Sequence, residues 1–387
     1  MRQIGKQAGW FSACLSGIRS EDLTGRILIL CAASCFFPFL LSVSVCFISF
    51  VFLLFQRCLL KKALIRKTLI PMYILFLLLL LVPLCRGRWL GLVAGGATVC
   101  ITIFFLLCCN RMSNRLFETI LPVCCLASYV SLLYAIGEKI VNGPAFRSTG
   151  GIYNANYYGT MLEFVMIICL YQIARKRAGR LFYIITIFSS VIGILLCDCQ
   201  SAWLAVLGGT LLLLYLCGKR RFLWVVPVAV VVLLGCALFI PGVLPRLSML
   251  PQNAATRFNI WYHAVLGFLE NPLFGGGTLA FYYLGEMSGT RHIMHAHSIY
   301  LDAFLSYGLV GTGIWLYYIR GYIMHLYRRY RACRYPAPLV MGILGTVMVH
   351  GVTDHTTLWM QTGMLLAVLL SGAFAKREIV LDSKQKV

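Results

Sequence analysis

Long apolar runs dominate the chain and predict its secondary structure. Runs long enough to cross about 30 Å of hydrocarbon as helices lie near residues 68–85, 89–109, 116–137, 157–174, 181–197, 202–217, 222–240, 298–319, 337–353 and 357–375. The run from Ile27 to Phe55 is longer than one span needs and contains Pro38, so it predicts two short helices packed as a hairpin. The pattern predicts an all-α, polytopic integral membrane protein with about 12 transmembrane helices, or about 11 if that run stays single.

One long polar segment, residues 241–297, interrupts this pattern. Within it a stretch of helical periodicity follows Thr256, a candidate N-cap, and ends at Asn271-Pro272. At about fifteen residues this helix is too short to span a bilayer, so we expect it to lie along the membrane surface with Trp261 as an anchor. No repeat or linker divides the chain. We expect one transmembrane domain, 1–387, that contains the loop 241–297.

Composition and the placement of charge support the membrane interpretation. Hydrophobic residues make up 60% of the chain and charged residues 12%, against about 25% charged residues in soluble domains. The net charge of +22 could indicate a nucleic-acid partner, but the basic residues follow the predicted spans instead. All but seven of the 34 lysines and arginines lie on one side, and the exceptions are Arg86, Arg88, Lys139, Arg147, Arg246, Arg257 and Arg291. The positive-inside rule then places both termini in the cytoplasm and segment 241–297 outside the cytoplasmic membrane.

The 17 cysteines do not predict a disulfide framework. Most of them fall within spans or at span ends, where a thiol behaves as a small apolar group, and segment 241–297 has none. We therefore expect neither a disulfide nor a cysteine metal site in that segment. Residues 1–26 lack a small-residue cleavage site and are expected to form a cytoplasmic lead-in.

Ionisable side chains gather at the end of the outer segment. Arg291 precedes the triplet His292, His295 and His297, and three histidines invite a zinc interpretation. The stretch from Arg291 to Gly311 has no cysteine or glutamate, and its spacing matches neither structural nor catalytic zinc sites, so no metal is predicted. A neutral imidazole can also accept a proton from a sugar hydroxyl. Arg257 is either a ligand-binding cation or a cation that faces lipid headgroups.

Several carboxylates and histidines leave two interpretations open. Glu163 and Asp302 either orient a site or lie near the membrane surface. Asp198 either supports a neighbouring site residue or is simply solvated. For His350, Asp354 and His355, which lie between the last two spans, we expect a plain polar turn.

An ordered set of motifs resembles the O-antigen ligase and O-antigen polymerase family. The motifs are Arg257-Phe-Asn-Ile-Trp261, Asn271-Pro-Leu-Phe-Gly-Gly-Gly277, His297-Ser-Ile-Tyr-Leu-Asp302 and Gly308-Leu-Val-Gly311. Upstream, Arg147-Ser-Thr-Gly-Gly-Ile-Tyr-Asn-Ala-Asn156 resembles a further segment of that family. Two positions depart from the family pattern, because Gln200 stands where an arginine is common and Ser298 stands where an asparagine usually follows the histidine.

The resemblance implies an enzyme that moves a glycan from a polyprenyl diphosphate carrier to an acceptor hydroxyl on the outer face of the membrane. No metal or cofactor is implied, and the acceptor is a glycan, a lipid or a protein. His297 and Arg257 are the expected catalytic residues, with His297 as base. The expected substrate-binding residues are Arg147, Asn156, Arg291, Gln200, Gly275 and Gly277.

A transporter or lipid flippase is the alternative class, since it would also have many spans and few charges. Transporters tend to have paired halves and helices interrupted near the membrane midplane, and the sequence has neither. A scaffold without chemistry would not explain arginines on the side where the positive-inside rule disfavours them. The glycan transferase is therefore the preferred hypothesis. The residues do not separate a polymerase from a ligase.

Overall fold

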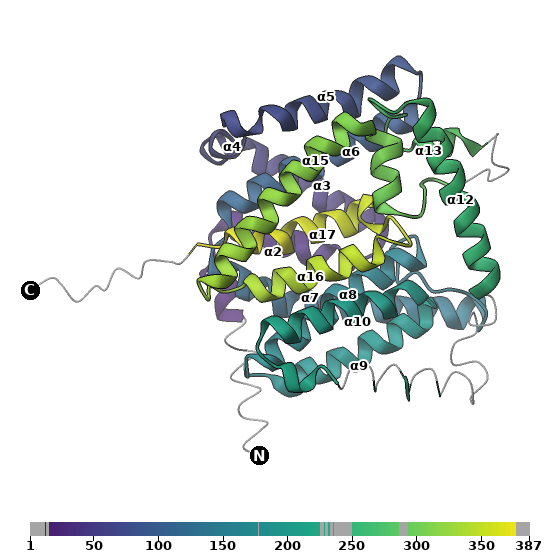
Figure 1. Ribbon diagram of the computed structural model, residues 1–387. Helices are drawn as coiled ribbons and strands as arrows, with labels where there is room; N and C mark the ends of the chain where they lie inside the picture. Colours follow the sequence, from purple (N-terminus) through teal and green to yellow (C-terminus); the bar gives the residue numbers. More distant parts are fainter. Residues whose placement is uncertain are drawn as a thin grey trace, which may run out of the picture.

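The computed structural model describes residues 15–176, 178–224, 250–285 and 293–376, together with Ser12, Val228, Val231, Val232 and Gly235. This part of the chain is helical (Figure 1). The α-helices are α2 Leu23–Ser34, α3 Phe39–Phe55, α4 Arg57–Leu64, α5 Ile70–Cys85, α6 Trp89–Arg111, α7 Asn114–Asn142, α8 Ala155–Ala174, α9 Arg180–Cys197, α10 Gln200–Leu216, α12 Leu250–Glu270, α13 Ala280–Tyr283, α15 Ile299–Arg331, α16 Ala337–His350 and α17 Met360–Ser371. Short 3-10 turns lie at Lys67–Leu69, Arg220–Phe222, Thr356–Leu358 and Gly372–Phe374.

The helices confirm a multi-pass membrane protein, and they refine the predicted spans. Six helices of the described residues are long and apolar enough to cross a bilayer, and these are 67–85, α6, α7, α8, α9 and α15. The run 27–55 is confirmed as two helices, because Pro38 caps α3 and α2 ends at Ser34. A seventh span is possible if α3 and α4, bent by 89° at Gln56, count as one. The total of 11 or 12 stays a prediction, and span 222–240 lies mostly outside the described residues.

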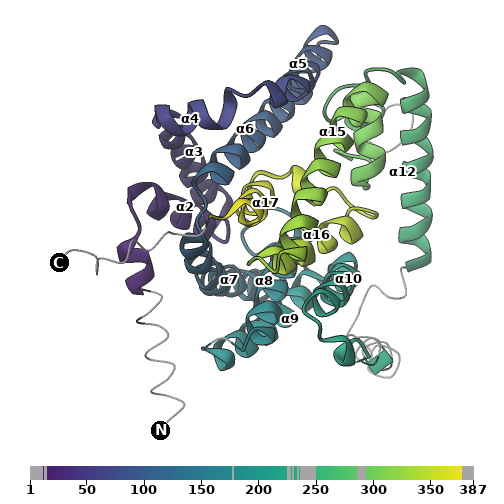
Figure 2. The ribbon, with the colours of Figure 1, turned by 60° about the vertical axis from the view of Figure 1, so that its left-hand side comes forward.

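Burial separates a central helix from the helices at the membrane-facing edge. In the most apolar 18-residue stretch of α8, 83% is buried inside the protein. The same share is 22% for helix 67–85 and 28% for α6. Helix α8 packs against α7, α9, α10 and α16, while α5 packs against α6 and α15. Figure 2 shows α5 and α6 diverging from the α15–α16 side of the bundle. The exposed apolar faces of α5 and α6 suit contact with hydrocarbon.

The two ends of the bundle carry different loops. At one end Arg111 forms an ion pair with Asp22, and the backbone of Asn114 donates to the carbonyl oxygen of Lys376. At the other end the segment around Arg147 meets the end of α9 and the α16–α17 connection. Segments that the positive-inside rule assigns to opposite faces therefore gather at opposite ends of the molecule.

The helix expected in the outer segment is longer than its periodicity indicated. Helix α12 begins at Leu250, so Thr256 lies inside it and donates its hydroxyl to the carbonyl oxygen of Gln252 instead of capping the helix. The prediction of the N-cap was wrong, because the polar residues before Thr256 are compatible with a helix end and with a solvated helical face. Figure 1 shows α12 lying across one end of the bundle.

Candidate active site

Five of the expected site residues line one cavity of about 420 Å³. Arg147 and Asn156 come from the segment before and at the start of α8, Gln200 from the start of α10, Arg257 from α12 and His297 from the loop before α15. Trp261 also lines it, one helical turn after Arg257 and on the same face of α12. The sequence motifs, although far apart along the chain, converge on one recess.

His297 is held in an unusual backbone conformation that directs its ring into this cavity. Its φ of 46° is in the left-handed region, which a residue with a β-carbon rarely adopts. The carbonyl oxygen of His297 accepts a hydrogen bond from Trp261 Nε1 at 3.4 Å, and its backbone N–H donates to His295 Nδ1 at 3.3 Å. Trp261 was expected to anchor α12 in the membrane surface. Its indole instead ties α12 to the histidine loop.

Asp354 fixes the ring of His297. The Nδ1 atom of His297 lies 3.1 Å from Asp354 Oδ1, which also accepts the backbone N–H of His355 at 2.8 Å. Because the carboxylate accepts, Nδ1 donates its proton to it, and Nε2 is the ring nitrogen that faces away from this bond. The interpretation of Asp354 as part of a plain polar turn was wrong, because the turn between α16 and α17 folds against the loop before α15.

A chain of hydrogen bonds joins this pair to the expected cation. Asn156 Nδ2 donates to Asp354 Oδ2 at 2.6 Å, and Asn156 Oδ1 accepts from Arg147 Nη2 at 2.7 Å. The carbonyl oxygens of Cys197 and Asp198, at the end of α9, accept further bonds from Arg147. Arg147 is therefore fixed on the cavity wall by neutral groups, so its charge is not cancelled by a direct carboxylate partner in the described residues.

The other two expected groups have unused hydrogen-bonding capacity. Within the described part of the chain, Arg257 has no hydrogen bond or ion pair and is partly buried on the cavity wall. Gln200 Nε2 is also buried, and it has no hydrogen-bond partner among the residues that the structure describes. A buried donor without a partner costs about 1–3 kcal/mol. Both groups suit a ligand that brings acceptor oxygens into the cavity.

Burial and hydrogen bonding set the charge of the two groups beside His297. Burial alone would raise the pKa of Asp354, but its hydrogen bond with His297 lowers it, and the resulting pKa is well below the usual range. Asp354 is therefore an ionised carboxylate that is only 2% exposed. Burial lowers the pKa of His295 to about 4, against the attraction of Asp354, so His295 is neutral at physiological pH.

His295, His297 and Asp354 are the described residues whose arrangement could hold a metal ion, since their ligand atoms lie within 4.8 Å of one another. Hydrogen bonds join these groups in the structure. His295 Nδ1 accepts the backbone N–H of His297, so the proton of the neutral His295 ring is on Nε2, which is 3.6 Å from Asp354 Oδ1. A metal at Nε2 would require that proton to move to Nδ1, where it would face another N–H.

The glycine turn has a structural role away from the cavity. Gly275 and Gly277 have φ values of 71° and 86°, and the backbone N–H groups of residues 275–277 donate to the carbonyl oxygens of Asn271, Leu305 and Ser306. Neither glycine lines the cavity, and their N–H groups are already used, so the expected substrate-binding role does not follow from the structure. Arg291 lies outside the described residues.

Two further buried pairs involve residues that the sequence left open. His350 Nδ1 lies 2.6 Å from Glu163 Oε1, and His355 Nδ1 lies 2.6 Å from Asp302 Oδ2. All four residues are less than a tenth exposed, so Glu163 and Asp302 orient buried histidines. In the sequence, each of these four residues is an ionisable residue close to the predicted outer end of a span. That signal indicates where such a residue lies, but it does not indicate which residue it contacts.

Part of the chain is similar to a known protein family. No curated protein matches the chain. A family model described as O-antigen ligase matches residues 184–316, a stretch that contains Gln200, Arg257 and His297 of the cavity. This part of the chain is therefore similar to the O-antigen ligase family.

Proposed function

We propose that the protein transfers a glycan from a polyprenyl diphosphate carrier to an acceptor hydroxyl at the outer face of the cytoplasmic membrane, without a metal ion. The observation that carries the proposal is the cavity that brings Arg147, Arg257 and His297 together while Asp354 orients the histidine. The working unit is one transmembrane domain, 1–387, whose loop 241–297 lies outside the cytoplasm with both termini inside.

The proposed reaction uses the side chains that line the cavity. The acceptor hydroxyl oxygen attacks the anomeric carbon of the donor sugar, and His297 Nε2 takes the hydroxyl proton. The bond between that carbon and the diphosphate oxygen breaks, and the polyprenyl diphosphate leaves with the electron pair. Arg257 and Arg147 stabilise the departing charge, since a guanidinium binds phosphate oxygens in a fork. Asp354 stabilises the imidazolium that forms.

Gln200 supports a modified version of the family pattern. It stands where relatives commonly have an arginine, yet its unpaired amide lies on the cavity wall. An amide donates a hydrogen bond to a phosphate or sugar oxygen without adding charge. The donor is therefore bound through Arg147 and Arg257 as the two described cations of the cavity.

The test separates transfer from transport by the side on which donor accumulates. In a His297→Ala strain, a transferase leaves the lipid-linked glycan on the outer face, because only the proton-accepting step is removed. An impermeant glycan probe on intact cells measures the amount of lipid-linked glycan on the outer face. Accumulation on the cytoplasmic face would favour the flippase, and normal transfer by purified His297→Ala protein would remove the residue from the mechanism.

A further inference from the structure

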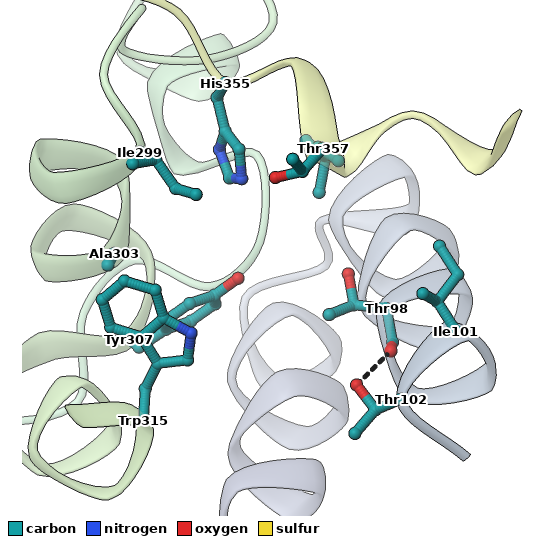
Figure 3. A pocket seen from close by; sticks show the side chains of 10 residues that line it. Thr98, Ile101, Thr102, Ile299, Ala303, Tyr307, Trp315, His355 and Thr357 are labelled. Carbon is teal, nitrogen blue, oxygen red and sulfur yellow. Dashed lines mark hydrogen bonds between the residues drawn. The ribbon is translucent and has the colours of Figure 1, made fainter. Parts of the chain in front are cut away.

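The recesses at the two ends of the bundle differ in charge. The recess beside His355, shown in Figure 3, has no lysine or arginine among its described lining residues. A cavity of about 500 Å³ at the opposite end has Arg329, Arg334 and Lys376 on its wall. This cavity, the basic pocket, has no aspartate or glutamate among the described residues that line it.

Three segments that are far apart in the chain build the basic pocket. Arg329 lies in the last turn of α15, Arg334 in the connection to α16, and Lys376 in the chain after α17. The backbone of Lys376 donates to Met112 and accepts from Asn114 at the start of α7, which brings the α6–α7 connection to the same place. Figure 1 shows the ends of α15 and α17 on the side of the bundle away from α12. The positive-inside rule assigns these segments to the cytoplasmic face.

Arg329 is held in place and still has unused hydrogen-bonding capacity. Its Nη2 atom donates to the carbonyl oxygens of Tyr335 at 2.8 Å and Ala375 at 3.0 Å. Its Nε atom is buried and has no hydrogen-bond partner among the described residues. The groups that fix the guanidinium are neutral, so they do not cancel its charge. A fixed guanidinium with an unused donor suits a ligand that brings acceptor oxygens.

The other two cations of the pocket also lack a carboxylate partner in the described part of the chain. The side chain of Arg334 makes no hydrogen bond or ion pair there, and Lys376 Nζ donates to the carbonyl oxygen of Asn110 at 3.3 Å. Arg334 is close enough to Arg329 for the two charges to repel each other. The carbonyl groups at the end of α15 supply only about half of a unit negative charge, which is too little to balance three cations.

Other arginines at this end of the molecule do have carboxylate partners. Arg111 forms an ion pair with Asp22 at 2.5 Å, and Arg175 forms one with Glu118 at 2.8 Å. Arg175 also stacks on the ring of Tyr335, 4.4 Å from its centre, so a paired charge supports the pocket wall. The positive-inside rule requires only that cations lie on the cytoplasmic side. It does not require three of them to share one cavity without a carboxylate.

From these contacts we propose that the basic pocket binds a phosphate group, presented by the headgroup of an anionic lipid in the cytoplasmic leaflet or by a soluble phosphate compound. Arginine contacts phosphate oxygens through a planar fork, and basic pockets between the cytoplasmic ends of membrane helices bind anionic headgroups. The bound phosphate would connect the end of α15 with the chain after α17. The inference does not rest on the proposed glycan transfer, because it concerns the opposite end of the molecule.

Lipid titration of the purified full-length protein, followed by native mass spectrometry, tests the lipid source. Anionic phosphatidylglycerol is compared with phosphatidylcholine, whose phosphate is balanced by a choline. We expect one tight site for phosphatidylglycerol, and Arg334→Gln should weaken it by at least about tenfold because a charged hydrogen-bond donor is lost. Arg331→Gln is the matched control, since Arg331 is an exposed cation at the end of the same helix that does not line the pocket. It should keep most of the affinity.

Inorganic phosphate is the probe for the soluble source. The melting temperature of the protein in detergent is measured in sodium phosphate and in sodium chloride of equal ionic strength. A rise in phosphate that Arg334→Gln loses and Arg331→Gln keeps would support the pocket and assign it to a soluble phosphate compound.

Arg334→Gln is the deciding variant, because it breaks no side-chain contact among the described residues, whereas Arg329→Gln also removes the bonds to Tyr335 and Ala375. If Arg334→Gln and Arg331→Gln respond alike to phosphatidylglycerol and to inorganic phosphate, the cations act only as general surface charge. That result would overturn the inference.

Discussion

At the scale of single residues, the proposed site depends on a histidine whose orientation is set by a carboxylate far away in the sequence. His297 and Asp354 are 57 positions apart, and Asn156 reaches Asp354 across 198 positions. Arg147, a proposed donor-binding cation, and His297, the proposed base, therefore share one hydrogen-bonded chain. A change in any member is expected to affect the chemistry more than the fold.

Arg257 should require a guanidinium and not merely a positive charge. Arg257→Lys is expected to lose glycan transfer nearly as severely as Arg257→Ala, because an ammonium cannot reproduce the two-pronged contact with a diphosphate. Thermal unfolding in detergent should be unchanged, since Arg257 has no partner in the described residues. Transfer assays with purified protein measure the effect. Near-normal transfer by the Lys variant would return Arg257 to the role of a headgroup-facing anchor.

Asp354 should act through His297. Asp354→Asn is expected to reduce the transfer rate by about 10²- to 10⁴-fold, because the amide no longer selects the tautomer with a free Nε2 or stabilises the imidazolium. Rate and KM are measured with the purified enzyme, and KM for the donor should change little. Glu270→Gln, an exposed carboxylate at the end of α12, is the control. Equal effects of the two changes would show that Asp354 has no specific role.

Acidification should destabilise the histidine loop through His295. Its folded pKa is about 4, below the ordinary value of 6.5, because burial disfavours the charged ring. Folding therefore favours the neutral form, and the stability that this form provides is present above pH 6.5 and is lost as the pH falls toward 4. The melting temperature of the wild type should fall more steeply over this range than that of His295→Asn. Parallel curves would contradict the buried neutral histidine.

At the scale of elements, the glycine turn and the kink in α15 form one packed unit. Gly308 has a φ of 62°, and a β-carbon there would lie 2.4 Å from the carbonyl oxygen of Leu273. The backbone N–H groups of Leu309 and Val310, just after the kink, donate to the carbonyl oxygens of Pro272 and Leu273. The motifs Asn271–Gly277 and Gly308–Gly311, which occur in order along the chain, thus meet in space and position the start of α15.

Gly308→Ala should destabilise the protein, because alanine meets both the backbone clash and the unfavourable φ. We expect a loss of about 1–3 kcal/mol, measured by thermal or denaturant unfolding in detergent. Gly313→Ala is the matched control in the same helix, since a β-carbon at Gly313 would have no neighbouring atom within 4 Å and alanine favours a helix. Similar losses in both variants would show that the kink does not require glycine.

At the scale of the whole molecule, the placement of charge agrees with a site on the outer face. The cavity lies at the end of the bundle opposite the contacts of Arg111 and Lys376, which belong to segments predicted to be cytoplasmic. The central helix α8 connects the two ends and has the greatest buried share of the candidate spans. Under the proposed function, a lipid-linked donor would approach this end from the surrounding bilayer.

Thiol labelling tests this orientation. In a background that lacks accessible native cysteines, Glu270→Cys should react with an impermeant thiol reagent in intact cells, and Arg220→Cys should react only after the membrane is permeabilised. Both positions are exposed in the structure. The reverse pattern would invert the topology and remove the proposed outer site.

Some features of the protein follow from the sequence alone. The apolar runs predicted the helices, because a chain segment in lipid must satisfy its own backbone hydrogen bonds, and Pro38 predicted the break between α2 and α3. The motifs also identified Arg147, Asn156, Gln200, Arg257 and His297, which the structure brings to one cavity. The partner of His297, the pairing of His355 with Asp302, and the structural use of Gly275 and Gly277 depended on the tertiary structure. Hydrogen bonds between loops far apart in the chain are set by how helices pack, and no local pattern specifies that packing.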